Sequence, residues 1–491
     1  MQAICSDQEK AGPQLPPPGW PKPNDCLSFA GNSLNNAAQR MIPGILKIFQ
    51  PAPAVPVTLS DPAEIAAKYR RWQTRVLIFS TAGYATFYFV RKNLGIAMPL
   101  MEHQLGITKV QLGLFLTLHG VLYGVSKFLN GFLADRANAR AFMAVSLAAS
   151  ALLNICFGYS SAVIAFGLIW MLNGWFQGMG FPPCARLIAN WFPPGQLATK
   201  FSVWNSSHNI GSIFILLLCG FLVSGSLFAP NWQLCFFVPA AIAMVIAILL
   251  WFMLPDTPPS VGLPEVAGSH MDTPENESPA EFRAFLWRQV FSNPYIWLLA
   301  TANFFVYAIR YAVFDWGATL LTEAKHIQIM HAAWMLSGFE VFGLLGALLG
   351  GWITDRFLGG RAARACVVYM ALAGVSVLLF WKIQTQSELL ITGLLCAIGF
   401  FVYGPQCLLA IACVNLATKR AAATAVGFTS IFGYASTVLS GWGLGFMVQH
   451  YGWNAGFAGL TGCAVLGTFL FAAAWPAKAN GYQEQGPQAK G

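Results

Sequence analysis

Charged residues are scarce in this chain of 491 residues. They make up 10% of it, well under half of their usual share in soluble domains, whereas 56% of the chain is hydrophobic. Apolar runs of about 20 residues recur from about residue 76 to residue 475, and each is long enough for a helix to cross ~30 Å of hydrocarbon. The sequence therefore predicts an all-α polytopic protein embedded in a lipid bilayer, and not a soluble globular domain.

The chain also lacks the residue clusters that metal and catalytic sites need. Its 11 Cys are scattered, and the two that lie closest in sequence, Cys407 and Cys413, have no His nearby, so apolar packing is their expected role. No phosphate-binding loop or nucleophile motif occurs, and the loops between the apolar runs are too short for a catalytic domain. We therefore expect no metal, no cofactor and no enzymatic activity.

The start of the chain has no apolar core of a secretory signal peptide. Residues 1–67 are polar and Pro-rich, which predicts a disordered tail. Within this tail, MIPGILKIFQ begins at Met41 and resembles a natural start, so we expect Met41 to be the initiator. The alternative is a genuine tail from Met1, and an intact-mass measurement on the native protein distinguishes the two.

Basic residues are divided unequally between the two sides of the predicted spans. By the positive-inside rule, the side that receives most of them is cytoplasmic, and it carries both termini and the central loop. Because these loops account for most of the net charge of +9, no nucleic-acid partner is expected. The twelve spans lie at about 76–100, 110–134, 141–159, 163–190, 202–224, 233–254, 294–321, 331–354, 364–382, 388–415, 422–449 and 453–475. The basic side receives Lys68, Arg70, Arg71, Arg75, Arg136, Arg140, Lys200, Arg283, Arg288, Arg356, Arg361, Arg364, Lys419, Arg420 and Lys478, and the other side only Lys109, Lys325 and Lys382.

The two halves of the chain repeat each other in sequence. GFLADRANAR (131–140) ends the second span and GGWITDRFLGGR (350–361) ends the eighth, and LATK recurs at 197–200 and 416–419. The predicted segments are a six-helix bundle at 68–254, a cytoplasmic linker at 255–293, a second six-helix bundle at 294–475 and a tail at 476–491. The repeated loops place four charged residues as candidates for gating or charge pairing: Asp135, Arg136, Asp355 and Arg356.

Two parallel six-helix repeats are the organisation of the major facilitator fold, which binds its substrate near the midplane between the halves. The G-x-L-A-D-R-x-x-x-R loop after the second span resembles the signature of that superfamily. The fold predicts a monomer.

Cations inside the predicted spans outnumber carboxylates. A charge at the centre of a membrane helix costs about 2.5–3.5 kcal/mol, so such residues mark functional sites. The surplus positive charge predicts an anionic ligand. The cations are Arg91, Lys92, Lys127 and Arg310, and the carboxylates are Glu340 and Asp315.

Helical spacing places polar and aromatic side chains beside these cations. Lys92 is turned by about 100° from Arg91, so the two need not bind one ligand. For any single tyrosine, packing is as good an explanation as ligand binding. The groups are Tyr84, Tyr88 and Arg91 in the first span, His119, Tyr123 and Lys127 in the second, Trp204, Asn205 and His208 in the fifth, Tyr307 and Arg310 in the seventh, Tyr403 in the tenth and Tyr434 in the eleventh.

Arg91 and Arg310 are the leading candidates for ligand binding because each half contributes one of them at nearly the same offset. Two guanidinium groups offer planar, forked donors that fit phosphate oxygens. Lys92 either takes part in gating or pairs with Glu340, and the sequence leaves both open.

At these residues the chain resembles a known family, the organophosphate:phosphate antiporters. This family includes glycerol-3-phosphate and hexose-6-phosphate transporters and a hexose-phosphate sensor. The resemblance covers about residues 68–475. It is carried by FVRKNLGIAMP, YGVSKFLNGFLADRANAR, GWFQGMGFPPCARLIANWF, WNSSHNIG, YAIRYAVFDWG, FFVYGPQ and AVGFTSIFGYAS.

The resemblance implies exchange of an incoming organophosphate for outgoing inorganic phosphate, by two halves that rock around one site. It implies that Arg91 and Arg310 bind phosphate, and that His208 and Lys127 belong to the site. It also matches Glu340 to an acidic position in the eighth span of the family. The aromatic lining implied by the family is Tyr84, Tyr88, Tyr123, Tyr307, Tyr403 and Tyr434.

The sequence departs from the family pattern at two places. The eleventh span, GFTSIFGYASTVLSGWGLG, lacks the Asp/Lys pair of the hexose-6-phosphate transporter type. His119 stands where the family is not expected to have a histidine, and it either shapes specificity or bonds to a neighbouring helix. SGFEVFGLLGALLGGWITDRFLGG and KYRRWQTR resemble the hexose-phosphate sensor more than the glycerol-3-phosphate transporter.

Two functions remain in view. The first is an inner-membrane antiporter that exchanges a hexose phosphate or glycerol-3-phosphate for inorganic phosphate. The second is a receptor that senses external hexose phosphate and signals to a histidine kinase. A proton-coupled carrier of an uncharged solute is disfavoured because Glu340 and Asp315 are the only candidate proton carriers.

Overall fold

The computed structural model describes residues 48–56, 61–134, 137–225, 229–266, 279–417 and 421–477. The predicted start at Met41, the Asp135–Arg136 pair, and the ends of both tails lie outside the described residues. Residues from Pro51 onward form one compact unit. Its described residues form helices and connections, with no strand.

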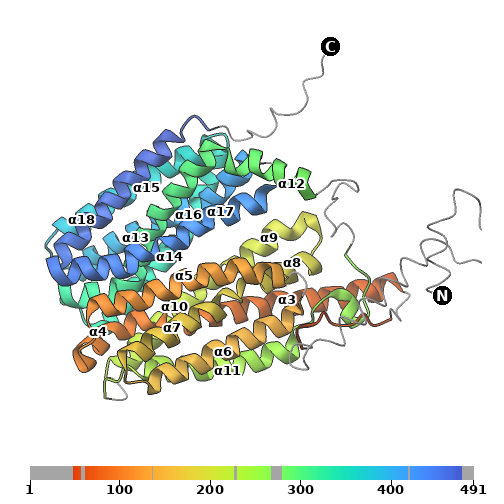
Figure 1. Cartoon of the computed structure of the whole chain (residues 1–491), viewed down its shortest axis with the longest axis horizontal. Coiled ribbons are helices and arrows are strands. Elements are labelled where there is room, and N and C mark those ends of the chain that lie inside the picture. Colours follow the sequence, from red (N-terminus) through yellow and green to blue (C-terminus); the bar gives the residue numbers. More distant parts are fainter. Residues whose placement is uncertain are drawn as a thin grey trace, which may run out of the picture. The chain divides into compact units, whose positions relative to one another are not determined.

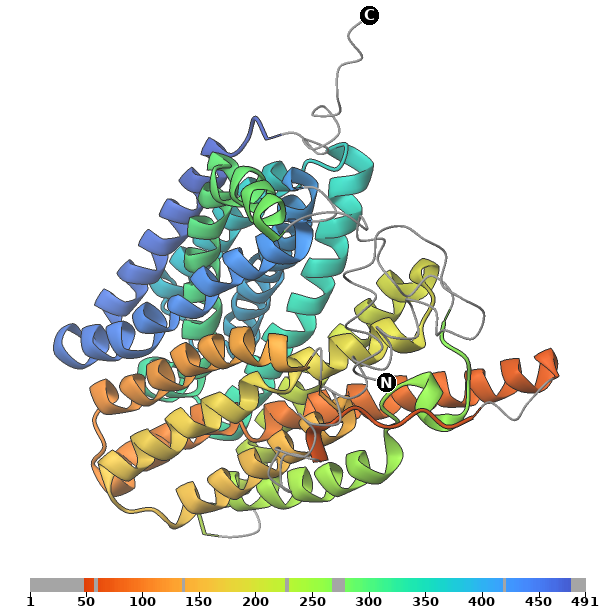
Figure 2. The ribbon, with the colours of Figure 1, turned by 45° about the vertical axis from the view of Figure 1, so that its right-hand side comes forward.

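Two groups of helices make up the unit, and they correspond to the two halves of the sequence (Figure 1). Figure 2 shows the same division after rotation. The first half consists of α3 (Pro62–Phe89), α4 (Asn93–Leu105), α5 (Lys109–Ala134), α6 (Ala139–Tyr159), α7 (Val163–Gly178), α8 (Phe181–Trp191), α9 (Pro194–Asn205), α10 (Ser207–Val223) and α11 (Leu234–Met253). The second half consists of α13 (Pro294–Ala324), α14 (Ile329–Phe357), α15 (Ala362–Lys382), α16 (Glu388–Leu416), α17 (Ala422–Ala435), η5 (Val438–Gly443) and α18 (Leu444–Ala473).

The linker between the halves contains η2 (Pro258–Val261), α12 (Pro279–Leu286) and η3 (Trp287–Phe291). It joins the end of α11 to the start of α13. We call this end of the helices the linker end, and the end that carries the α4–α5 connection the opposite end.

Ten of the described helical stretches are long and apolar enough to cross a membrane. The longest, Thr424–Ala473, holds two spans that meet at a kink at Gly452, where φ is 76°. The first predicted span is not among the ten, and it consists of two helices, α3 and α4. With these two adjustments the described residues account for the twelve predicted spans, and the predicted all-α fold is confirmed.

The expectation of one continuous helix over 76–100 was wrong. α3 ends at Phe89 and α4 begins at Asn93, so the chain breaks its helix at the two adjacent cations.

The halves meet along α5, α10 and α4 of the first half and η5, α14 and α13 of the second. The approach of α5 to η5 requires residues without a side chain. A Cβ atom built on Gly113 would lie 2.5 Å from the carbonyl oxygen of Gly441. Close backbone approach through glycine is typical of helix packing in membranes, where burial of apolar surface drives association little.

Candidate functional site

Arg91 lies in the break between α3 and α4, and aromatic rings surround its charge. Its guanidinium carbon is 4.0 Å from the ring centroid of Tyr88 and 4.9 Å from that of Tyr123. Such distances permit cation–π attraction, which partly offsets the loss of hydration. Its Nε atom is buried without a hydrogen-bond partner among the described residues. Donor capacity therefore remains available on this guanidinium.

Arg310 occupies the corresponding place in the second half, on α13, and is 8% exposed. Its guanidinium carbon lies 4.5 Å from the ring centroid of Tyr403, with two more rings of α13 at about the limit of cation–π contact. These rings belong to Tyr307, at 6.0 Å, and Tyr311, at 5.9 Å. A chain of ring contacts links the two guanidinium groups, because Tyr434 lies 4.9 Å from Tyr123, which Arg91 contacts, and 6.3 Å from Tyr307, which neighbours Arg310.

Neither arginine forms an ion pair with a described carboxylate. The two carboxylates within the site have other partners. Asp315 Oδ1 lies 2.5 Å from Lys92 Nζ. Glu340 accepts hydrogen bonds from Tyr403 Oη and, at 3.0 Å, from Asn209 Nδ2. Two guanidinium groups without a paired carboxylate make a site that favours an anion.

Lys92 and Lys127 each bridge the two halves. The Lys92–Asp315 ion pair joins the break in the first half to α13, and its side chains are 11% and 14% exposed. Lys127 of α5 donates a hydrogen bond of 3.1 Å to Tyr434 Oη of α17. The sequence left open whether Lys92 takes part in gating or pairs with Glu340, and the structure pairs it with Asp315 in place of Glu340.

The predicted tyrosines gather between the arginines. Tyr434 is the centre of this group, because its ring lies 4.9 Å from that of Tyr123 and 6.3 Å from that of Tyr307. Tyr88 adds a contact with the ring of His208, at 6.0 Å. The Nδ1 atom of His208 donates to the carbonyl group of Asn205, which leaves its Nε2 atom buried and without a described partner.

Tyr84 joins this group, because its ring lies 5.9 Å from that of Tyr88. Trp204 is fully buried and packs 4.7 Å from Tyr84, so its ring belongs to the packing of the first half behind the group. Asn205 is exposed. His119 lies 5.3 Å from the ring of Trp170 and bonds through Nδ1, at 3.2 Å, to the Trp170 carbonyl oxygen on α7. Of the two roles considered for His119, these contacts match a hydrogen bond to a neighbouring helix.

Asp355 and Arg356 are exposed near the end of α14, at the linker end. Along the helix axis they therefore lie far from Arg91 and Arg310, and they are not part of the anion site. Their counterparts Asp135 and Arg136 are outside the described residues.

Sequence reasoning missed Tyr311 and Asn209. Tyr311 follows Arg310 directly, and its ring lies 5.0 Å from Lys92 Nζ, so it contacts cations of both halves. Asn209 follows His208 and holds Glu340 from across the interface. The available signal was the same for both: a polar or aromatic side chain inside a span beside a candidate residue.

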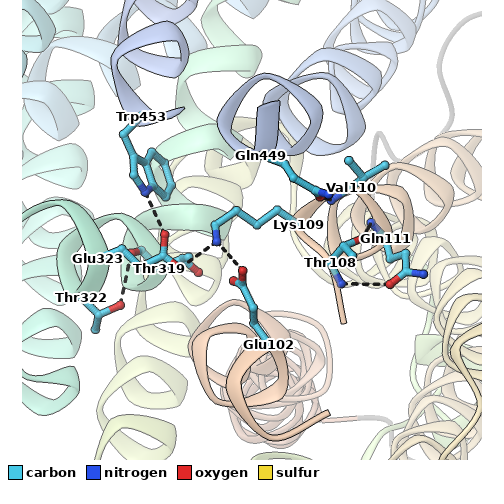
Figure 3. Close-up of polar contacts among 10 residues, drawn as sticks. All are labelled: Glu102, Thr108, Lys109, Val110, Gln111, Thr319, Thr322, Glu323, Gln449 and Trp453. Carbon is cyan, nitrogen blue, oxygen red and sulfur yellow. Dashed lines mark hydrogen bonds and ion pairs between the residues drawn. The ribbon is translucent and has the colours of Figure 1, made fainter. Parts of the chain in front are cut away.

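A second polar cluster joins the halves at the opposite end (Figure 3). Lys109, at the start of α5, forms an ion pair with Glu102 of α4 and another, of 2.9 Å, with Glu323 of α13. Trp453 Nε1 donates to the second oxygen of Glu323 at 2.9 Å. The backbone nitrogen of Val110 donates to Gln449 Oε1 of α18 at 2.9 Å. The halves are thus held together at this end by polar contacts as well as by packing.

Contacts between the halves thin out toward the linker end. Among the described residues, the hydrogen bond between Lys127 and Tyr434 is the last one between α5 and α17 in that direction. Farther along, Gly131 of α5 and Gly427 of α17 have no atom within 4 Å of a built Cβ. The two groups of helices are held together at the opposite end and diverge toward the linker end (Figures 1 and 2).

Comparison with known proteins gives consistent matches over most of the chain. Residues 81–441 match the sequence profile of the Major Facilitator Superfamily. A "Probable hexose phosphate transport protein" of Chlamydia pneumoniae is 37% identical over 446 residues, which cover 88% of this chain and 97% of the relative. The "Glycerol-3-phosphate transporter" of Bacillus subtilis (strain 168) is 38% identical over 441 residues, which cover 88% of this chain and 98% of the relative.

A third relative, the "Membrane sensor protein UhpC" of Escherichia coli (strain K12), is 33% identical over 427 residues, covering 86% of this chain and 96% of the relative. Among solved structures, an inward-facing bacterial homolog of the human lysosomal transporter Spinster matches with a TM-score of 0.69 at 15% identity. That match covers 85% of this chain and 99% of the other, and it supports the fold alone.

Proposed function

Because the chain belongs to the Major Facilitator Superfamily and, within it, to the family of hexose phosphate and glycerol-3-phosphate transporters, we propose that it exchanges an organophosphate for inorganic phosphate. Membership in a transporter family agrees with the expectation that the chain is not an enzyme. The substrate class proposed is a phosphate monoester, either a hexose phosphate or glycerol-3-phosphate.

The observation that carries this proposal is the pair Arg91 and Arg310. Each half supplies one guanidinium, and each faces tyrosine rings where a carboxylate partner would otherwise be expected. A phosphate group brings two or more oxygens that can accept forked hydrogen bonds from both sides. Tyrosine hydroxyl groups around the arginines can replace part of the hydration that phosphate loses on entering the site.

Such a site couples binding to movement of the halves. Without an anion, two like charges face each other across the interface and oppose its closure. A bound phosphate neutralises this repulsion and lets the halves close on it, after which they can open on the other side. Movement would then require a bound anion in both directions, which is the behaviour of an exchanger.

We further propose that the linker end is cytoplasmic and that the protein lies in the inner membrane. The predicted loops at this end carry most of the basic residues, as the positive-inside rule requires. The closed opposite end would then face outward, and the described conformation would be open to the cytoplasm. Proteolysis of the linker in sealed right-side-out and inverted vesicles tests this orientation.

The test of function is uptake of radiolabelled phosphate into proteoliposomes that are preloaded with phosphate. Rapid uptake that requires internal phosphate supports exchange. Competition by glucose-6-phosphate and by glycerol-3-phosphate then identifies the organophosphate. Uptake at the same rate without internal anion would contradict exchange.

Sensing is the second candidate, because relatives named as membrane sensor proteins are 33–35% identical to this chain. A sensor would use the same arginines, with the ligand favouring one conformation and not crossing the membrane. Binding of a hexose phosphate with negligible exchange in the same proteoliposomes would favour this function. A histidine kinase would be its expected partner.

A further inference from the structure

The break between α3 and α4 lies inside the bundle, where water is scarce and backbone groups need partners. Val90 and Lys92 have φ/ψ angles of −102°/18° and −103°/−1°, away from the regular helix. The backbone nitrogens of Arg91 and Lys92 both turn back to the carbonyl oxygen of Tyr88, at 3.3 and 2.9 Å. Arg91 therefore lies within a tight turn that begins at Tyr88.

Three asparagines hold this turn, and all are fully buried. The carbonyl oxygen of Val90 accepts hydrogen bonds from Asn154 Nδ2 of α6, at 2.9 Å, and from Asn173 Nδ2 of α7, at 2.8 Å. On the other side of the turn, Asn93 Nδ2 donates to Asn154 Oδ1 and to the carbonyl oxygen of Cys235, both at 2.8 Å. We call Asn93, Asn154 and Asn173 the Asn cluster.

Burying the Asn cluster costs free energy that a protein with a continuous helix here would avoid. A buried amide side chain is unfavourable in apolar surroundings and is tolerated when it finds hydrogen-bond partners. In a continuous helix the backbone would bond to itself, and apolar residues at 154 and 173 would pack without this cost. The cluster and the break therefore depend on each other.

The break determines where the two neighbouring cations point. Arg91 faces Tyr88 and Tyr123 of its own half, whereas Lys92 reaches Asp315 of the other half. Both directions depend on the backbone dihedral angles at this turn, which the Asn cluster fixes from two neighbouring helices.

We propose that Asn154 and Asn173 are positioning residues for the anion site: by holding the Val90 carbonyl group they fix the turn that directs the Arg91 guanidinium toward phosphate. This inference rests on the phosphate-binding function proposed above. It assigns a role in ligand affinity to two side chains that act through Arg91 and need not touch the ligand themselves.

The first experiment measures binding of radiolabelled inorganic phosphate to the full chain in nanodiscs. The variant is Asn173→Leu, which removes one of the two side-chain donors to the Val90 carbonyl group. The matched control is Asn130→Leu, because Asn130 of α5 is also buried in the first half, but its hydrogen bonds to described residues stay within its own helix, at Ser126. We expect Asn173→Leu to weaken phosphate binding by about tenfold and Asn130→Leu to change it by less than about twofold.

A second background separates positioning from general loss of structure. In an Arg91→Lys background the flexible lysine adjusts its own direction. Adding Asn173→Leu to Arg91→Lys should therefore weaken phosphate binding by less than about twofold relative to Arg91→Lys alone. An equal loss in both backgrounds would overturn the proposal. So would equal effects of Asn173→Leu and Asn130→Leu in the wild-type background.

Hydrogen–deuterium exchange of the same nanodisc samples tests the turn without a ligand. Peptides that cover residues 88–95 should exchange faster in Asn173→Leu than in the wild type. In Asn130→Leu they should exchange at the wild-type rate. Unchanged exchange in Asn173→Leu would overturn the proposal even if the variant folds well. The wild type could fail to bind phosphate while Asn173→Leu still exchanges faster than the wild type at residues 88–95. That result would refute the proposed function and retain the turn-holding role of the two asparagines.

Discussion

Lys92 and Asp315 form an ion pair of 2.5 Å between the two halves, although 223 residues separate them in the sequence. Both side chains are largely buried, at 11% and 14% exposure. The pair neutralises the cation that neighbours Arg91, so that the positive charge of the site is concentrated on the arginines. It also links the broken first span to the helix that carries Arg310.

Breaking this pair from one side should cost more than removing both partners. Asp315→Asn leaves Lys92 without its carboxylate, and an uncompensated buried charge costs about 3–5 kcal/mol. The double variant Lys92→Met, Asp315→Asn should recover a large part of the lost thermal stability. Thermal unfolding in detergent of the two single variants and the double variant checks this, and additive losses would mean that the two side chains do not interact.

Arg310→Lys should abolish phosphate exchange, with a loss of at least about a hundredfold. Lysine keeps the charge, but it lacks the planar fork that binds two phosphate oxygens at once. The measurement is phosphate uptake into phosphate-loaded proteoliposomes. Arg288→Lys is the control, because Arg288 is exposed in η3 of the linker, outside the predicted spans. Wild-type exchange in Arg310→Lys would refute the two-arginine site.

The fold and its repeat could be predicted because apolar run length and loop charge are local properties of the sequence. The pair Arg91 and Arg310 could be found because it recurs in both halves. The break at Val90 could not, since the stretch FYFVRKN contains neither Pro nor Gly, and its stability depends on Asn154 and Asn173 in other helices. The partner of Lys92 was missed for the same reason: only the packing of the halves brings Asp315 to it.

The cluster at the opposite end should hold that end closed. Lys109 stands at the start of α5, and its two carboxylate partners stand near the ends of α4 and α13, where helix dipoles disfavour each charge. These charges are therefore stabilised by one another. When the halves separate, Lys109 keeps Glu102, which lies in its own half, and loses Glu323.

Glu323→Gln should accordingly favour opening at this end. The pair is partly exposed, so its loss should change the ratio of open to closed forms by only about two- to fivefold. Hydrogen–deuterium exchange of peptides covering residues 104–112 measures the change. Glu102→Gln is the matched control, because it alters an ion pair within one half. Equal exchange in both variants would show that the pair of Lys109 with Glu323 does not hold the halves together.

His119 should contribute to stability and leave substrate preference unchanged. Its ring packs against Trp170 and its Nδ1 atom bonds to the Trp170 carbonyl oxygen, so both contacts lie within the first half. His119→Phe keeps the ring packing and loses this hydrogen bond, which should lower the free energy of unfolding by about 1 kcal/mol. The affinity ratio for glucose-6-phosphate and glycerol-3-phosphate should stay within about twofold. A change of this ratio by about tenfold with unchanged thermal stability would instead make His119 a specificity residue, whose Nε2 atom reaches the organic part of the substrate.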